Sequence, residues 1–226
     1  MTLPTSFLAA SRRRRGEQES RSQIAYRQIK GKIITLELPP ASIIDESQLM
    51  NELGLGHTPI REAIQRLALE NLVVILPRRG TIVADLNLSD LQKVFEVRLE
   101  MEVLAVRLAV ERATPEQIAA MEALLADSGS LIHSGDHEQL IRLDHQAHRL
   151  LAQAAHNEVL EESLERLYNH VLRLWHVSLA KVSRLREAIE EHRDIIAAVK
   201  ARDGDRAATV MRAHVAGFQE EFLAVL

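Results

Sequence analysis

The fold is decided by residues 45–80, whose sequence is DESQLMNELGLGHTPIREAIQRLALENLVVILPRRG. The first part carries the apolar residues Leu49, Met50 and Leu53 at helical spacing. Gly54 follows, and glycine readily adopts the positive φ that ends a helix. A second segment with helical spacing starts a few residues later. The stretch therefore predicts a helix, a tight turn and a second helix.

The second helix has its own start signal. Thr58 is predicted as its N-cap, because the hydroxyl can accept a hydrogen bond from an exposed amide, and Pro59 at the first helical position sacrifices no hydrogen bond. The apolar face consists of Ile60, Ala63, Ile64 and Leu67, while Arg61, Gln65 and Arg66 point elsewhere.

A β-branched run follows the second helix. Residues 72–76 read LVVIL, residues 77–80 form a basic turn, and residues 81–84 read TIVA. Two short β-branched runs around a turn predict a pair of strands. Helix, turn, helix and basic hairpin together predict a winged helix-turn-helix that lays its second helix in the major groove of DNA.

These residues resemble a known family. TPIREAIQRL followed by ENLVVILPRRGTIV is similar to the DNA-binding domain of the GntR family of bacterial transcription regulators, over about residues 24–83. The family usually has Ser-Arg before its Thr-Pro, where this chain has Gly56 and His57, and Pro-Gly where Pro39 and Pro40 stand. Since the missing arginine is a phosphate or base contact, the resemblance does not carry over an operator sequence or an affinity.

Arg61 is the first candidate for reading DNA, since a guanidinium can donate two hydrogen bonds to a guanine edge or bind a phosphate. The alternative is a surface arginine paired with Glu62 or Glu70. Thr58 is a candidate for a phosphate contact. Further candidates on the same predicted face are Ser47, His57, Gln65, Arg78, Arg79 and Gly80.

Charge divides the chain into unlike halves. Up to Gly80 there are 12 Lys/Arg against 8 Asp/Glu, and beyond it 16 against 24, so the half with the predicted reading helix is the basic one. The chain contains no cysteine and no apolar run long enough to span a bilayer, which fits a cytoplasmic protein without membrane contact. We expect a disordered basic arm at 1–20, whose RRRR at 12–15 either is solvated or adds phosphate contacts. A winged helix-turn-helix domain is expected at 21–84 and an all-helical domain at 85–226.

The helical half is expected to be an all-α bundle, which makes the whole protein mainly α. SDLQ at Ser89 and TPEQ at Thr114 resemble capping boxes. No glycine-rich phosphate loop, GxSxG elbow or cysteine nucleophile is present. In the N-terminal half a supporting helix is expected over about 22–36, ended by Pro39 and Pro40. The helices of the bundle are expected at about 89–111, 115–127, 137–154, 157–180, 184–201 and 205–224.

Four polar residues of the bundle have a spacing that predicts a metal site. Asp144 and His148 are four residues apart and share one helix face. His192 and His214 each lie about eleven residues from the centre of the turn ARDGD, so an antiparallel hairpin sets them at the same height. Three imidazoles and a carboxylate suit zinc or nickel, with manganese and iron as further options. The alternative is a plain hydrogen-bonded pair of Asp144 with His148.

The remaining histidines show no such pairing and are expected at the surface or in loops: His133, His137, His145, His156, His170 and His176.

A second resemblance extends the first. DHQAHRLLAQAAHN and, later, EEHRDIIAAVKARDGDRAATVMRAH are similar to the effector-binding domain of the FadR-type subgroup of the GntR family, over about residues 88–218. In many members, residues matching the four above bind a metal together with a small carboxylate. The resemblance also implies that Arg98 pairs with the carboxylate of the effector; its alternative is a surface ion pair with Glu102.

The sequence and the resemblance together imply a repressor or activator that binds a pseudo-palindromic operator in double-stranded DNA. That it binds as a homodimer is what the operator symmetry and the resemblance to the family imply. A small carboxylic acid at the metal site would change the relation between the two domains through the segment at 84–88. Two alternatives stay open: a metal-dependent hydrolase, in which the metal activates water, and a regulator whose metal is purely structural.

Overall fold

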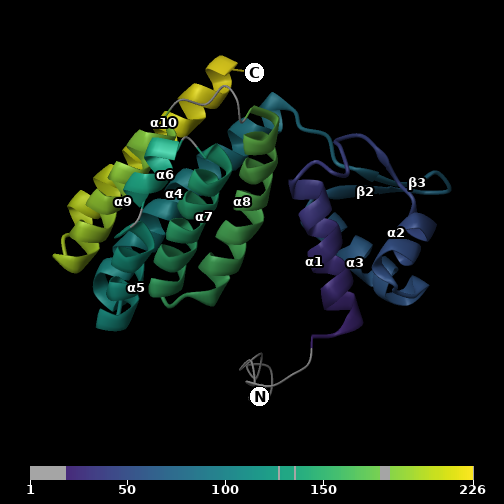
Figure 1. Cartoon of the computed structure of the whole chain (residues 1–226), viewed down its shortest axis with the longest axis horizontal. Coiled ribbons are helices and arrows are strands. Elements are labelled where there is room, and N and C mark those ends of the chain that lie inside the picture. Colours follow the sequence, from purple (N-terminus) through teal and green to yellow (C-terminus); the bar gives the residue numbers. More distant parts are fainter. Residues whose placement is uncertain (1–18, 127, 135, 179–183, 226) are drawn as a thin grey trace, which may run out of the picture.

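The protein consists of two units that lie side by side in the computed structural model, a small N-terminal unit and a larger helical bundle (Figure 1). The structure describes residues 19–225 except 127, 135 and 179–183. The arginine run at 12–15, which we considered as an additional phosphate contact, lies outside the described residues.

The N-terminal unit is a helix-turn-helix closed by a small sheet. Its apolar core is separate from that of the bundle and includes Ile29 and Ile33 of the first helix, Ile60 and Leu67 of the third, and Val83 of the last strand. The strands form an antiparallel sheet in the order β1-β3-β2, and β1 is a strand that the sequence did not predict. The elements are α1 (Arg21–Ile34), β1 (Ile43–Ile44), α2 (Glu46–Leu53), α3 (His57–Leu69), β2 (Val73–Leu76) and β3 (Gly80–Val83).

The turn between α2 and α3 matches the prediction at Gly54, which has φ 62° and caps α2. The predicted N-cap of α3 is wrong. Gly56 holds that position, without a side-chain hydrogen bond, and the helix begins at His57. Pro59 thereby becomes the third helical residue, where its missing N–H still costs nothing because the first-turn amides have no intrahelical partner. The expectation that Pro39 and Pro40 end α1 is also wrong, because the helix ends at Ile34, several residues before Pro39.

The bundle contains seven helices among the described residues. The predicted cap at Thr114 is confirmed, since its hydroxyl accepts from the Gln117 amide and the Gln117 side chain accepts from the Thr114 amide. The cap predicted at Ser89 is wrong, because α4 starts one residue earlier and Asn87 accepts from the Asp90 amide. The elements are α4 (Leu88–Arg112), α5 (Pro115–Ala126), α6 (Ser128–Ser134), α7 (His137–Ala154), α8 (Glu158–Ser178), α9 (Leu185–Lys200) and α10 (Gly204–Val225), of which the sequence did not predict α6.

Helices α4, α7, α9 and α10 surround the middle of the bundle, with α10 packed along α4 and α9. Helix α8 packs on α4 and α7, and of the bundle helices it faces α1 of the N-terminal unit (Figure 1). None of the described helices has the length and apolar character required to cross a membrane.

Candidate metal centre and DNA-reading surface

Four side chains from three helices converge in the interior of the bundle. Asp144 and His148 come from α7, His192 from α9 and His214 from α10, and all four are buried. One ligand atom from each lies within 4.8 Å of all the others. The structure therefore brings together the four residues that the spacing singled out.

The three imidazoles point their Nε2 atoms at one oxygen of Asp144. The distances to its Oδ1 are 2.9 Å for His192, 3.5 Å for His214 and 3.9 Å for His148. Metal–ligand distances of about 2.1 Å separate neighbouring ligand atoms by roughly 3.4 Å around a tetrahedral ion and by roughly 3.0 Å around an octahedral one, and both values are within this span. The plain hydrogen-bonded pair of Asp144 with His148 is not what the structure contains, since His192 is the histidine within hydrogen-bond distance of Asp144.

Hydrogen atoms on the ring nitrogens give an independent reason to expect a cation here. Arg98 Nη2 lies 3.0 Å from His148 Nε2, and because arginine has only donors, that nitrogen must be an acceptor. His214 Nδ1 donates to Glu191 at 2.8 Å, so a neutral His214 carries no hydrogen on Nε2. The two Nε2 atoms are 3.1 Å apart. Unless His214 is protonated, these are two ring nitrogens without hydrogens, an arrangement that a metal ion would bridge.

Burial and the neighbouring side chains together set the protonation of the cluster. Burial lowers the pKa of His148 to about 4 and also lowers that of His192, so both are neutral ligands at neutral pH. Burial opposes the charge of Asp144 too, but the neighbouring histidines outweigh it and hold the pKa of that carboxyl well below its usual range. Burial also opposes the charge of His214, but its hydrogen bonds with Asp144 and Glu191 outweigh this and raise its pKa. A divalent ion bound here would meet two neutral imidazoles and an ionised carboxylate, and would displace a proton from His214.

Further side chains support three of the four residues, and Glu191 behind His214 is one of them. Tyr168 donates its hydroxyl hydrogen to Asp144 Oδ2, the oxygen that faces away from the histidines. Glu102 Oε1 lies 2.9 Å from His148 Nδ1. No pattern in the sequence indicates Tyr168 or Glu191 as part of this site, and Glu102 was expected only as a partner of Arg98.

Arg98 is buried beside this cluster and is not a surface residue. Its Nε lies 3.3 Å from Glu102 Oε1, and its guanidinium lies over the Tyr168 ring, 4.7 Å from the centroid. The ion pair with Glu102 exists, but the surface location assumed in that alternative is wrong because both side chains are buried.

Two of the six remaining histidines were wrongly expected at the surface or in loops. His145 on α7 is only 20% exposed and stacks on the Tyr168 ring with centroids 4.4 Å apart. His170 on α8 is partly buried and donates from Nε2 to the carbonyl oxygen of Glu70 at 3.1 Å. Both are helical residues near the boundary between the two units.

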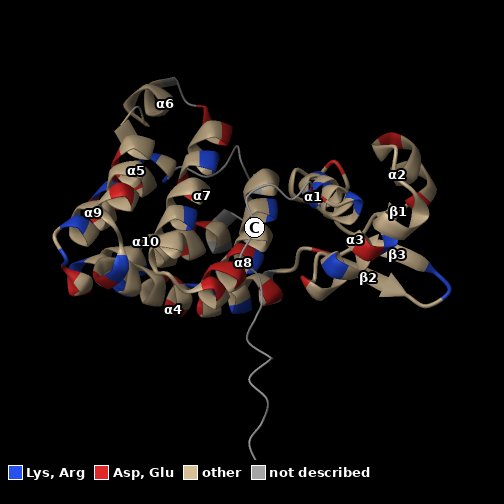
Figure 2. Cartoon of the chain, turned by 90° about the horizontal axis from the view of Figure 1, so that it is seen from below, with Lys and Arg blue, Asp and Glu red and all other residues tan. Residues whose placement is uncertain are grey.

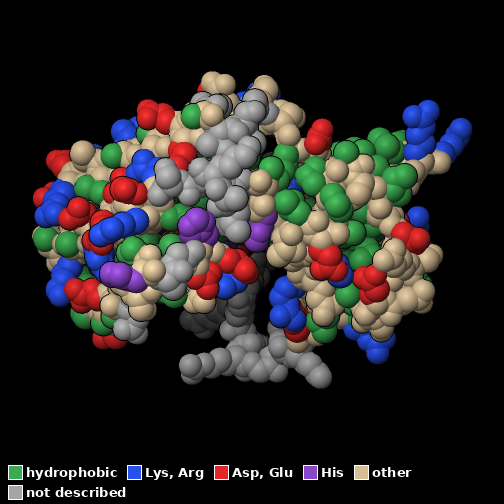
Figure 3. All heavy atoms as spheres, turned by 45° about the horizontal axis from the view of Figure 1, so that its top comes forward, with side chains coloured by type: hydrophobic (Ala, Val, Ile, Leu, Met, Phe, Trp, Pro, Cys, Tyr) green, Lys and Arg blue, Asp and Glu red, His purple; other side chains and the backbone are tan. Residues whose placement is uncertain are grey.

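The predicted DNA-reading residues form the exposed side of the N-terminal unit. Arg61 is 64% exposed and lies 3.7 Å from Glu46 of α2, in place of the partners Glu62 and Glu70 that we considered. The turn between β2 and β3 carries Lys/Arg side chains and projects from the body of the unit (Figures 2 and 3). The exposed candidates are Ser47, His57, Thr58, Arg61, Gln65, Arg78, Arg79 and Gly80.

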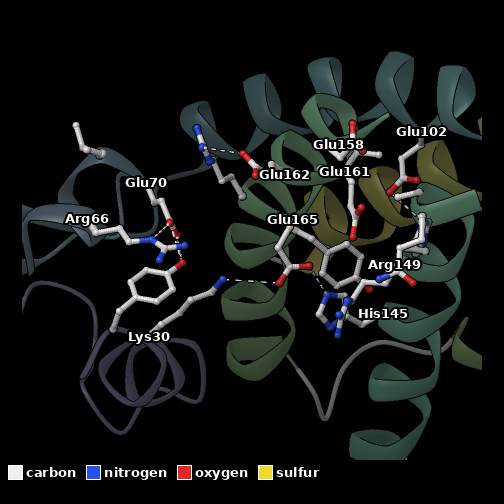
Figure 4. A pocket seen from close by; sticks show the side chains of 18 residues that line it. Lys30, Arg66, Glu70, Glu102, His145, Arg149, Glu158, Glu161, Glu162 and Glu165 are labelled. Atoms are coloured by element: carbon white, nitrogen blue, oxygen red, sulfur yellow. Dashed lines mark hydrogen bonds and ion pairs between the residues drawn. The ribbon is translucent and has the colours of Figure 1, made fainter. Parts of the chain in front are cut away.

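A cleft of about 860 Å³ separates the N-terminal unit from the bundle (Figure 4). Lys30 and Arg66 line it from the N-terminal unit, and Glu165 lines it from α8. Its lining also includes Glu102 and His148, so the cleft reaches the edge of the four-residue cluster.

Comparisons with known proteins agree with this division into two units. Residues 21–83 match the sequence family described as bacterial regulatory proteins, gntR family, and residues 93–217 match the FCD domain. The chain is 30% identical over 192 residues to the uncharacterized HTH-type transcriptional regulator YdhC of Bacillus subtilis, covering 84% of this chain and 85% of that one. It is also 30% identical to the HTH-type transcriptional repressor GlaR of Escherichia coli over 198 residues, covering 84% and 90%. The solved structure of E. coli McbR/YncC superposes with a TM-score of 0.81 at 25% identity, over 92% of this chain and 99% of that one.

Proposed function

The chain belongs to the GntR family of bacterial transcription regulators and carries an FCD domain, and on that premise we propose that a small carboxylic acid bound at a metal site controls its binding to operator DNA. That it is a DNA-binding regulator follows from the family. Its relatives are regulators, so the metal-dependent hydrolase is set aside.

The observation that carries the proposal is the pair of facing Nε2 atoms of His148 and His214, both directed at Asp144. Together with His192 they would hold one divalent ion, with zinc or nickel favoured and manganese or iron as further options. Such an ion supplies a positive charge with positions left for a carboxylate oxygen. Arg98, beside His148, would donate to the same carboxylate.

On DNA, α3 would enter the major groove and the β2–β3 turn would contact the backbone. Arg61 is proposed for base or phosphate contact, and Arg78 and Arg79 for phosphates. A homodimer would present two such surfaces to a pseudo-palindromic operator in the cytoplasm. We propose repression as the outcome, because the relative GlaR is named a transcriptional repressor.

The test begins with metal content. Wild type, purified without a histidine tag, is expected to hold about one ion per chain, and the double variant His192→Ala, His214→Ala to hold none. The matched control is His133→Ala, His156→Ala, which replaces two exposed histidines.

A thermal-shift screen of small carboxylates at saturating zinc then tests the effector. We expect at least one acid to stabilise wild type and to lose its effect in Arg98→Met. Absence of metal after incubation with zinc and nickel would refute the metal site. Zinc binding without a response to any acid would favour a structural ion.

A further inference from the structure

Helix α8 contacts the candidate metal site with one residue and the DNA-binding domain with three others. Tyr168 is buried and donates its hydroxyl hydrogen to Asp144. The hydroxyl binds Oδ2 of Asp144, the oxygen that faces away from the histidines. A rotation of the Asp144 carboxylate would therefore move the atom to which Tyr168 is hydrogen-bonded. Tyr168 therefore ties α8 to the metal site.

Three further side chains of α8 make contacts across the boundary to the DNA-binding domain. Glu165 accepts from His145 Nε2 at 3.3 Å through one oxygen, and its second oxygen lies 3.7 Å from Lys30 Nζ of α1 (Figure 4). His170 donates to the carbonyl oxygen of Glu70, and Arg173 to that of Ala84. These contacts reach α1, the end of α3 and the residue after β3.

Glu70 is the C-cap of α3, the helix proposed to read DNA. Its carboxylate accepts the hydroxyl hydrogen of Tyr26 on α1, at 2.7 and 2.8 Å to the two oxygens. The Arg66 guanidinium lies over the Tyr26 ring, 3.7 Å from its centroid. A displacement of His170 therefore acts on the place where α1 and the end of α3 are joined.

We propose that α8 transmits the state of the metal site to the DNA-binding domain, with Tyr168 as the contact on the metal side and Glu165, His170 and Arg173 as the contacts on the DNA-binding side. This inference rests on the proposed function and names the elements that carry its regulation. Occupation of the site fixes Asp144 and through it Tyr168, and α8 then holds α1 and the end of α3 in one orientation.

The boundary is suited to such a switch because its contacts are polar and surround a cleft. Glu165 is 36% exposed, and the separate apolar cores of the two domains stay intact when these contacts break. A partly exposed ion pair such as that of Lys30 with Glu165 is individually weak, so ligand binding can make or break it. Coupling between sites is commonly 5- to 150-fold, which a few such contacts can supply.

Hydrogen exchange with zinc alone as the probe tests the proposal. In wild type, saturating zinc is expected to slow exchange in peptides of α1 and of the α3–β2 junction by roughly 3- to 10-fold. The double variant Lys30→Met, His170→Ala removes two of the docking contacts. In this variant zinc is expected to slow exchange in the same peptides by less than about 2-fold. The matched control Lys32→Met, His176→Ala changes the same residue types on the same helices. Lys32 pairs with Glu37 and Glu52 within its own domain, and the control should respond as wild type does.

Tyr168→Phe tests the metal side independently, since it keeps the docking contacts and the ring stacking but removes the hydroxyl. At saturating zinc it is expected to bind the ion while losing the slowing of exchange in α1. Wild-type slowing in either Tyr168→Phe or the double variant would overturn the proposal. Zinc stoichiometry is measured first by calorimetry, so a failure of wild type to bind zinc refutes the metal site itself and is distinguished from a failure of transmission.

Discussion

The His214 ring is held at both nitrogens. Its Nδ1 donates to Glu191, while its Nε2 faces Asp144. The other oxygen of Glu191 accepts from Arg184 at 2.6 Å. A carboxylate behind a ligand histidine fixes the ring and raises its basicity, and such partners commonly change metal affinity 10- to 100-fold. Glu191 and Arg184 are thus expected to act on the metal through His214.

Replacing Glu191 by Gln should weaken zinc binding by roughly 10-fold, because the amide keeps the shape but loses the charge that stabilises a metal-bound imidazole. Competition with a zinc chelator measures the affinity. Glu190→Gln is the matched control, since that neighbour pairs with Arg193 at the surface. Equal affinities for the two variants would show that Glu191 does not act on the metal.

Gly217 gives a test that leaves Glu191 in place. A Cβ at this position would lie 1.6 Å from Arg184 Nη1, so Gly217→Ala forces the guanidinium away from its present position. Because the displaced group is the end of a flexible side chain and alanine favours a helix, unfolding free energy should change by no more than about 1 kcal/mol. Zinc affinity is nevertheless expected to fall several-fold, as calorimetry would detect. An unchanged zinc affinity would mean that the hydrogen bond from Arg184 to Glu191 does not affect metal binding.

Residue patterns predict only those parts of the site that helix geometry fixes. Asp144 with His148 follows from the helical repeat, and His192 with His214 from the symmetry of a hairpin. Tyr168 and Glu102 come from helices whose rotation against α7 depends on side-chain packing, so no spacing in the sequence indicates them. For the same reason, the positions of His145 and His170 at the domain boundary could not be predicted.

At the scale of elements, the helices were predicted more closely than their caps. The helix expected at 137–154 matches α7, because its apolar stripe is wide and regular. Thr58 and Ser89 were good N-cap residues, yet Gly56 and Asn87 hold those positions because the preceding chain decides where each helix begins. Strand β1 is only two residues long and exists because it pairs with β3, a contact that no local pattern shows.

The hairpin of β2 and β3 is expected to contribute to the affinity for DNA through its turn. Arg78 and Arg79 are exposed at the turn between β2 and β3, which suits contact with phosphates. The double variant Arg78→Ala, Arg79→Ala should lower the slope of log binding constant against log salt by about 2, since each lost phosphate contact releases about one counterion fewer. Fluorescence anisotropy with a duplex at several salt concentrations measures the slope. Arg27→Ala, Lys93→Ala removes two exposed charges elsewhere and should leave it unchanged.

For the whole molecule, the boundary between the domains should respond to acid through His170. Burial, followed by the charge of Arg173, lowers the pKa of His170, while Glu70 and Asp90 raise it. A lowered pKa means that docking favours the neutral ring, so docking is fully stabilised above the ordinary histidine value of about 6.5 and weakens as pH falls below it. Small-angle scattering should show a larger radius of gyration at pH 5.5 than at pH 7.5. His170→Gln keeps a donor but cannot titrate, and a change of equal size in that variant would assign the effect to other groups.

Removal of the metal should affect the two domains unequally, because each has its own apolar core. An ion present at 100 times its dissociation constant stabilises the folded bundle by about 2.7 kcal/mol, which for a domain of this size corresponds to roughly 5–10 °C in melting temperature. Calorimetry with and without a chelator should therefore show a large shift of the bundle transition and a smaller shift of the transition of the DNA-binding domain, which α8 transmits. The variant His192→Ala, His214→Ala should show no shift. A shift of the same size in that variant would mean that the chelator acts elsewhere, whereas a DNA-binding-domain transition that does not move in wild type would contradict transmission through α8.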